Sequence, residues 1–200
     1  MAVKIQIGMA SRRAYNLLNP QSGYYNPDAL AAITGLSTAE LQRAMRMASN
    51  KTIKWTRVQF ARQLQGEIAG SERLAITQKM LKQRVQIANA EKNEEAARMW
   101  VGLYNMNLIR FGDGRAFRTG HIVQGRYVEG GFRARMKSSG HVGIFYRLTS
   151  DRMPIIEEGV PIKQHAWRPL NQVMNQAEER LVQELKQAIK YLMAKKQGVA

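Results

Sequence analysis

The stretch GGFRARMKSSGHVGIFYRLTSDRMPIIEEGVP, residues 130–161, constrains the fold more than any other segment of the chain. Two short runs with apolar or alternating character, residues 131–136 and 142–148, flank the turn-prone residues 137–140. Alternation on both sides of a glycine-containing turn predicts a β-hairpin with a four-residue loop. We expect three glycines to adopt a positive φ or to permit close backbone approach, namely Gly131, Gly140 and Gly143. We expect three apolar residues of the same block to be buried, namely Phe132, Ile144 and Phe145.

Basic residues alternate along the first arm of this hairpin. Arg133, Arg135 and Lys137 are each two residues apart, which places them on the face opposite Phe132 and Met136. A row of three positive charges either lines a channel or stays in water. The row is our first candidate for contact with DNA.

Helices are expected on both sides of the block. Asn26 followed by Pro27 predicts a short helix that ends near Gly35. Residues 37–40 have the spacing of a capping box, and apolar residues then recur at helical spacing to about residue 69, where Gly70 is expected to end the helix.

A second, basic helix is expected over residues 71–89. Its exposed side would carry Lys79, Lys82 and Arg84, either as a solvated face or as a contact for phosphate or an acidic protein. These residues complete the set of candidate DNA-facing positions.

The remaining segments predict short antiparallel strands and one long terminal helix. Residues 99–103, 108–111 and 121–128 have strand character, and the glycines at 112–114 predict a turn. Residues 170–195 carry a continuous apolar stripe, which must be covered by the chain's own sheet or by a neighbouring subunit. The expected fold class is α+β, with a small antiparallel sheet of four or five strands packed with long amphipathic helices.

Composition places limits on the organisation and partners of the chain. We expect a single domain over residues 37–196, an N-terminal extended arm over residues 1–36 and a flexible tail over residues 197–200, with both arms ordering only against neighbours. The absence of cysteine excludes disulfides and thiolate metal sites, and it fits the reducing cytoplasm. The chain has no apolar run long enough for a membrane span, and residues 1–7 alternate like a strand instead of forming a signal sequence.

The net charge of +16 favours polyanionic partners such as DNA, and most of the surplus lies within residues 51–150. Charge alone would support a non-specific nucleic-acid-binding module. However, the sequence lacks a helix-turn-helix, a zinc finger or evident aromatic residues interleaved with the basic ones.

The sequence contains little that indicates catalysis. The three histidines, His121, His141 and His165, lack metal-ligand spacing, and Ser139 is too close to His141 in a tight turn to form a nucleophile and base pair. The acidic pair Glu157 and Glu158 is expected to be solvated or to contact an arginine of a neighbour. We therefore expect a protein that is not an enzyme and that has no metal and no cofactor.

Three parts of the sequence, in this order, resemble the minor tail protein Z family of tailed bacteriophages, whose members act in tail completion at the neck. The first part is a long helix with the basic segment 76–85 after it, and the second is the hairpin block. The third part is Pro154 and Pro161 with a terminal helix after them. Together the three parts run from about Leu41 to Leu192. The residues that carry the family motif as structural positions are Gly131, Phe132, Gly140, Gly143, Phe145, Arg147, Pro154 and Pro161.

The resemblance implies a virion protein located in the tail or neck. It implies a cyclic homo-oligomer, with sixfold symmetry to match a tail tube, and partners among the other neck and tail tube proteins. DNA would pass through the ring without sequence readout. Alternatives that stay open are a tail-tip or baseplate adaptor ring of the same virion and a non-specific DNA-binding protein.

Overall fold

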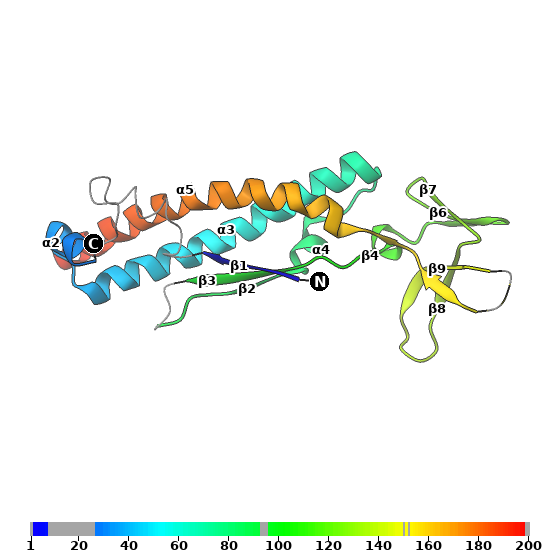
Figure 1. Cartoon of the computed structure of the whole chain (residues 1–200), viewed down its shortest axis with the longest axis horizontal. Coiled ribbons are helices and arrows are strands. Elements are labelled where there is room, and N and C mark those ends of the chain that lie inside the picture. Colours follow the sequence, from blue (N-terminus) through cyan, green and yellow to red (C-terminus); the bar gives the residue numbers. More distant parts are fainter. Residues whose placement is uncertain (1, 8–26, 93–95, 150, 152, 199–200) are drawn as a thin grey trace. The chain divides into compact units, whose positions relative to one another are not determined.

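The computed structural model describes residues 2–7, 27–92, 96–149, 151 and 153–198, and it confirms the α+β class. The chain divides into two compact units. Unit 1 comprises residues 61–81 and 103–169, and unit 2 comprises residues 2–60, 82–102 and 170–200. Two long helices, α3 (Thr38–Glu72) and α5 (Ile162–Lys196), each contribute residues to both units, and Figure 1 labels them.

Unit 2 combines these helices with a three-stranded antiparallel sheet. The sheet has the order β1-β3-β2 and is formed by β1 (Ala2–Ile7), β3 (Ala97–Gly102) and β2 (Val85–Ala88). The predicted strand at the start of the chain is therefore confirmed over Ala2–Ile7. The expectation that the whole N-terminal arm orders only against neighbours is wrong for Ala2–Ile7, because these residues pair with β3 of the same chain.

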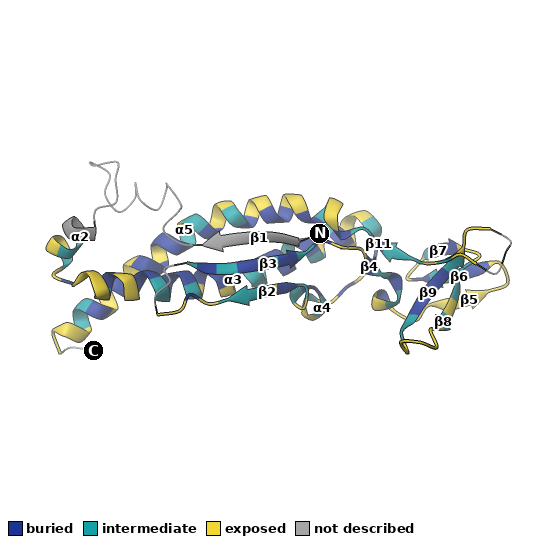
Figure 2. Ribbon diagram, turned by 60° about the horizontal axis from the view of Figure 1, so that its bottom comes forward, coloured by how far each residue is buried: buried dark blue, intermediate teal, exposed yellow. Residues whose placement is uncertain are grey.

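The core of unit 2, where its side chains are described, comes from α3, β2, β3 and α5. Along β3 the buried positions alternate, with Ala97, Met99 and Val101 at most 1% exposed. Within this unit α3 and α5 lie side by side, and Lys51 Nζ of α3 is 3.2 Å from Glu184 Oε2 of α5 (Figures 1 and 2). The apolar stripe of α5 is buried within this chain, which agrees with cover by the chain's own elements, and its buried members here are Leu170, Val173, Ala177, Leu181, Val182, Leu185, Ala188, Ile189 and Leu192.

The helix starts predicted at Pro27 and after Ser37 are confirmed, whereas the predicted end at Gly70 and the predicted start at Leu170 differ from the structure. α2 (Pro27–Thr34) stops before Gly35, which has a φ of 66°. α3 continues through Gly70 to Glu72, because the left-handed conformation that breaks the helix lies at Arg73, with a φ of 55°. α5 begins at Ile162 instead of Leu170 and keeps Pro169 inside the helix.

The basic helix expected over residues 71–89 is wrong. Helix α4 covers only Gln78–Lys82, and the chain then enters β2, in which Val85 is 1% exposed and pairs with Val101 of β3. The spacing of apolar residues fitted a helix, but pairing with a strand later in the chain determines the conformation here. The helical part of the family pattern, residues 76–85, is therefore not one helix.

Unit 1 contains three small antiparallel sheets around a 3-10 turn. The first sheet has the order β10-β9-β8 and is formed by β8 (Phe132–Arg135), β9 (Val142–Arg147) and β10 (Ile155–Glu157). The second has the order β5-β6-β7 and is formed by β5 (Arg115–Phe117), β6 (Gly120–Val123) and β7 (Arg126–Glu129). The third pairs β4 (Met106–Asn107) with β11 (Gly159–Val160).

Two expectations for this part of the chain are wrong. Residues Leu108–Phe111 form the 3-10 helix η1 instead of a strand, which buries Leu108 and Phe111 together against the neighbouring strands. The chain also has more than the four or five expected strands, because residues 120–129 fold back as a hairpin and the shorter strands pair locally. Among the described residues, no helix combines the length and apolar character needed to cross a membrane.

Candidate functional site

The hairpin predicted from residues 131–148 is present in unit 1. β8 and β9 pair with Phe132 opposite Phe145 and Arg135 opposite Val142. The loop is closed by the Met136 N–H donating to the His141 carbonyl at 2.8 Å, and Gly140 has a φ of 68°. A residue with a side chain would be strained at Gly140, so glycine is required by the turn.

The basic row lies on the exposed side of this hairpin, as predicted. Arg133 and Arg135 are exposed and alternate with the half-buried Phe132 and Ala134, while Lys137 is exposed in the loop. Arg133 Nη2 lies 3.2 Å from Asp113 Oδ1, with both side chains largely in water. Such a pair contributes about 0–1 kcal/mol, so Arg133 can exchange this partner for another anion.

The second group of candidate basic residues lies around α4. Lys79 is exposed on this helix, whereas Lys82 and Arg84 are half-buried. The Lys82 carbonyl accepts a hydrogen bond from Arg57 Nη2 at 2.9 Å, and the Arg84 carbonyl accepts one from the Gly102 N–H at 2.9 Å. Lys82 and Arg84 thus belong to the junction between α3, α4 and the sheet, and the three residues do not form one face of a long helix.

Three of the residues carried over from the family pattern, Phe132, Phe145 and Arg147, lie together. Phe145 is 3% exposed and its ring centroid is 6.3 Å from that of Phe132, over which Arg147 is placed at 5.6 Å. Phe132 itself is half-buried instead of buried.

Close approach explains two of the glycines in this pattern. A Cβ on Gly143 would lie 2.9 Å from Cζ of Phe145, and one on Gly131 would lie 2.8 Å from the Val128 carbonyl oxygen. Pro154 is exposed ahead of β10, and Pro161 lies between β11 and α5. The glycines and prolines of the pattern shape the backbone of the block, and their side chains offer no polar group to a ligand.

The two adjacent carboxylates have partners within the chain, whereas we expected solvated charge or a contact with an arginine of a neighbour. Glu157 Oε1 is 2.7 Å from Nε2 of His141, and Glu158 Oε1 accepts from Nη2 of Arg126 at 2.7 Å. The backbone N–H of His141 donates to Ser139 Oγ at 3.3 Å while its ring contacts Glu157. His141 is therefore not arranged as a base for Ser139.

Arg126 forms the centre of a charged network that the sequence did not indicate. Its guanidinium contacts both Glu72 Oε2 at 2.8 Å and Glu158 Oε1 at 2.7 Å, and Glu72 Oε1 also contacts His165 Nε2 at 2.8 Å. These side chains are between 11% and 30% exposed. The network joins the end of α3, β7 and the start of α5, and its members satisfy one another.

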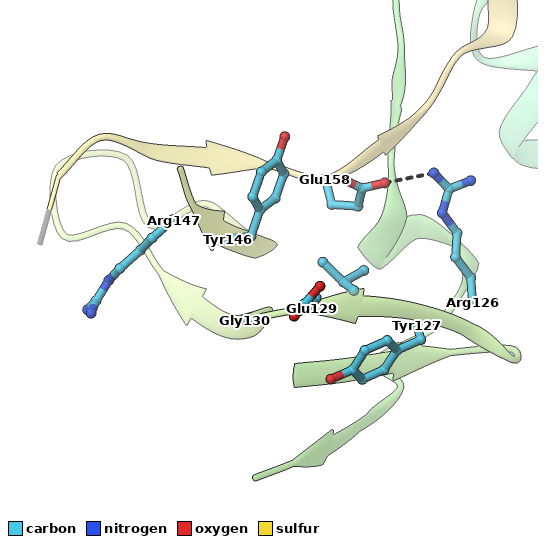
Figure 3. Close-up of a pocket in the computed structure, with 8 residues that line it drawn as sticks. Arg126, Tyr127, Glu129, Gly130, Tyr146, Arg147 and Glu158 are labelled. Carbon is cyan, nitrogen blue, oxygen red and sulfur yellow. Dashed lines mark hydrogen bonds and ion pairs between the residues drawn. The ribbon is translucent and has the colours of Figure 1, made fainter. Parts of the chain in front are cut away.

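A depression of about 490 Å³ lies beside this network (Figure 3). Its lining residues are Arg126, Tyr127, Val128, Glu129, Gly130, Tyr146, Arg147 and Glu158. Figure 3 shows Arg126 directed toward Glu158, so the charges of these two groups neutralise each other. Cations and carboxylates alternate around the depression, and no single ligand charge is favoured. Within the described residues there is no cluster of three or more metal-binding side chains.

A chain of polar contacts also links Ser71 to His165 and His165 to Glu72. Ser71 Oγ is 3.1 Å from His165 Nδ1, and His165 Nε2 is 2.8 Å from Glu72 Oε1. The Ser71 hydroxyl, however, donates to the Glu67 carbonyl of its own helix at 2.6 Å, and Glu72 is shared with Arg126. The serine proton is thus engaged by the helix backbone, and the arrangement acts as a structural tie.

The sheet β5-β6-β7 exposes an aromatic and basic face that sequence reasoning missed. Phe117 and Tyr127 are each 47% exposed, and the Arg115 guanidinium lies 5.5 Å from the Phe117 ring centroid. The expectation that aromatic residues do not accompany the basic ones is therefore wrong for this face. The Gln124-Gly125 turn between two strand-like runs was the signal that could have revealed the hairpin.

Comparison with known proteins found no relatives. No protein-family model matches the chain, and neither a curated protein nor a solved structure is significantly similar to it.

Proposed function

We propose that this chain is a structural subunit of a tailed-bacteriophage virion that completes the tail at the neck. The subunits form a ring that ends the tail tube, receives the head and lets DNA pass. The proposal rests on the resemblance of the hairpin block and the terminal helix to the tail-completion family. Its partners would be further copies of itself and the other neck and tail tube proteins.

The observation that carries the proposal is the exposed basic row of the β8–β9 hairpin. Arg135 and Lys137 are exposed, and Arg133 is paired with the solvent-exposed carboxylate of Asp113. In a ring, each subunit repeats this row. A lumen lined in this way attracts the phosphate backbone without reading sequence, which suits DNA in transit.

A tail-tip or baseplate adaptor makes similar demands of a ring and is the second candidate. Immunogold electron microscopy of intact particles separates the two positions. Label at the head–tail junction is the expected result. Label at the distal tip would replace tail completion by the adaptor function, and particles without label would overturn the virion assignment and favour a DNA-binding protein.

The role of the basic row is tested with the double variant Arg135→Glu/Lys137→Glu. We expect particles that assemble with normal tails and that package or eject DNA poorly. Lys163→Glu/Lys190→Glu is the matched control, because it changes the charge equally at exposed positions of α5. Normal DNA transfer by the row variant, in particles that contain it, would exclude a lumen-facing row.

A further inference from the structure

The outer face of the β5-β6-β7 sheet combines exposed rings with positive charge. Its strand register gives two rows of residues across this face, Arg115 with Ile122 and Tyr127, and Phe117 with Gly120 and Glu129. The opposite face is the packed one, since His121, Val123 and Val128 are between 0% and 7% exposed. All three residues of β5 are exposed, as the yellow segments around its label in Figure 2 indicate.

The ring of Tyr127 is held in place although it is exposed. Its hydroxyl donates to the Thr119 carbonyl at 2.8 Å and contacts Thr119 Oγ1 at 2.9 Å. A Cβ on Gly120 would lie 2.8 Å from Cε2 of the ring, so the ring lies across a position that has no side chain. The side-chain conformation of Tyr127 is thus already fixed before any ligand binds, so the ring presents a preorganised aromatic surface.

Phe117 supplies a second ring, and Arg115 lies beside it in the same row of the sheet as Tyr127. Arg115 stacks over Phe117, and Arg118 follows it directly on the chain and is exposed. Residues 103–149 contain only two acidic residues, Asp113 and Glu129. Their basic residues number eight, which are Arg110, Arg115, Arg118, Arg126, Arg133, Arg135, Lys137 and Arg147.

We infer that this face binds single-stranded nucleic acid, with bases stacked on Tyr127 and Phe117 and phosphates held by Arg115 and Arg118. Exposed rings beside arginines are the arrangement by which single strands are bound without strong sequence preference. A duplex hides the faces of its bases from such rings. Glu129 is the one carboxylate in the two rows, and residues 103–149 carry eight basic residues against two acidic ones, so the charge of this part of the chain favours a polyanion over a second copy.

This inference goes beyond passage of DNA through a ring. The row at Arg133 and Arg135 contacts a duplex by charge alone, whereas the β5-β6-β7 face uses unstacked bases. Binding is measured on the free full-length protein, so its outcome is independent of whether the chain occupies a phage neck.

The test is fluorescence anisotropy with a labelled oligothymidylate of about twenty nucleotides, compared with an abasic strand of the same length. The double variant Phe117→Leu/Tyr127→Leu should weaken oligothymidylate binding by about tenfold or more. Its affinity for the abasic strand should not change. Tyr191→Leu is the matched control, because Tyr191 on α5 is also 47% exposed, and it should bind like the parent protein.

A second variant tests the phosphate contacts and does not alter the rings. Arg115→Gln/Arg118→Gln should reduce the slope of log Kd against log salt by about 1.4, because each phosphate contact to a single strand contributes about 0.7. Circular dichroism checks that all variants are folded. An unchanged oligothymidylate affinity in the aromatic variant, or an unchanged salt slope in the arginine variant, overturns the inference. Loss of binding to an acidic polypeptide in both variants, with nucleic-acid binding intact, would assign the face to a protein instead.

Discussion

At the scale of single residues, Ser37 and Glu40 show how local chemistry fixes the start of α3. The Glu40 N–H donates to Ser37 Oγ at 3.3 Å, and the Glu40 carboxylate accepts from the Ser37 N–H at 2.7 Å and from its hydroxyl at 2.9 Å. The backbone and then the side-chain hydrogen bonds from Ser37 lower the pKa of Glu40 from its ordinary 4.5. The ionised form is therefore the one that caps the helix.

Because the folded pKa of Glu40 is lowered, its stabilising contribution is fully present above pH 4.5 and is lost as the pH falls through the folded pKa. Glu40→Gln should be less stable than the parent at neutral pH. The difference should shrink as both proteins are acidified below that value. Urea denaturation at a series of pH values measures it, and a difference that does not depend on pH would show that the charge of Glu40 is unimportant.

Gln124 fixes the β6–β7 turn to the segment after α3. Its φ of 48° and that of Gly125, 88°, are those of a type I′ turn. Its side-chain oxygen accepts from the Ala75 N–H at 2.5 Å, and its amide nitrogen donates to the carbonyls of Ala75 at 3.1 Å and Phe111 at 2.5 Å. One side chain therefore satisfies backbone groups from two other segments of unit 1.

Gln124→Asn should lower the free energy of unfolding by about 1 kcal/mol, because asparagine accepts the positive φ but is too short to reach these groups. Gln124→Ala should cost at least as much. Gln172→Ala, at an exposed position of α5, is the control and should change nothing. Chemical denaturation gives all three values, and a neutral Gln124→Asn would mean that water replaces the lost bonds without cost.

At the scale of elements, Asn50 joins α3 to the segment that follows β2. Its Oδ1 accepts from the Ala90 N–H at 2.6 Å and its Nδ2 donates to the Ala90 carbonyl at 3.2 Å. Ala90 is 5% exposed, so its backbone groups would otherwise be buried without partners. The helix thereby holds the end of the strand through one amide.

Asn50→Ala should destabilise the protein by about 1–3 kcal/mol, because both backbone groups of Ala90 lose their partner away from water. Lys54→Ala, one turn further along α3 and exposed, should have little effect. Hydrogen exchange provides a local measurement, in which the Ala90 amide should become less protected. Unchanged protection of that amide in Asn50→Ala would contradict the assignment.

The elements that sequence could predict are those fixed by neighbouring residues. The capping box at Ser37, the loop at Gly140 and the alternation of Arg133 and Arg135 all depend on contacts within a few positions of the chain. Residues 83–88 could not be assigned correctly, because β2 depends on β3, which begins at Ala97. A helical spacing of apolar residues therefore fails where a distant strand offers backbone partners.

At the scale of the whole molecule, the candidate surfaces are assembled from segments that sequence does not connect. The basic row at Arg133 was visible because it lies on one strand. The pair Phe117 and Tyr127 requires two successive hairpins, and the Arg126 network requires α3, β7 and α5. Charge and composition indicated a polyanionic partner, but they could not locate a surface for it.

The net charge of +16 leads to a last prediction about the response of the chain to salt. Folding brings like charges together, while exposed ion pairs such as Arg133–Asp113 contribute only about 0–1 kcal/mol each. Screening shortens the Debye length from about 30 Å at 0.01 M salt to about 8 Å at 0.15 M. It therefore weakens long-range repulsion more than contact pairs, and Tm should rise over this range.

Thermal denaturation followed by far-UV circular dichroism measures this rise. Lys186→Gln/Lys190→Gln removes two exposed positive charges from α5 and should show a smaller rise, because less repulsion is left to screen. A Tm that falls as sodium chloride is added would mean that the local ion pairs outweigh the net repulsion. The Arg126 network would then be the first place to look for that contribution, since its members Glu72, Glu158 and His165 are each less than 20% exposed.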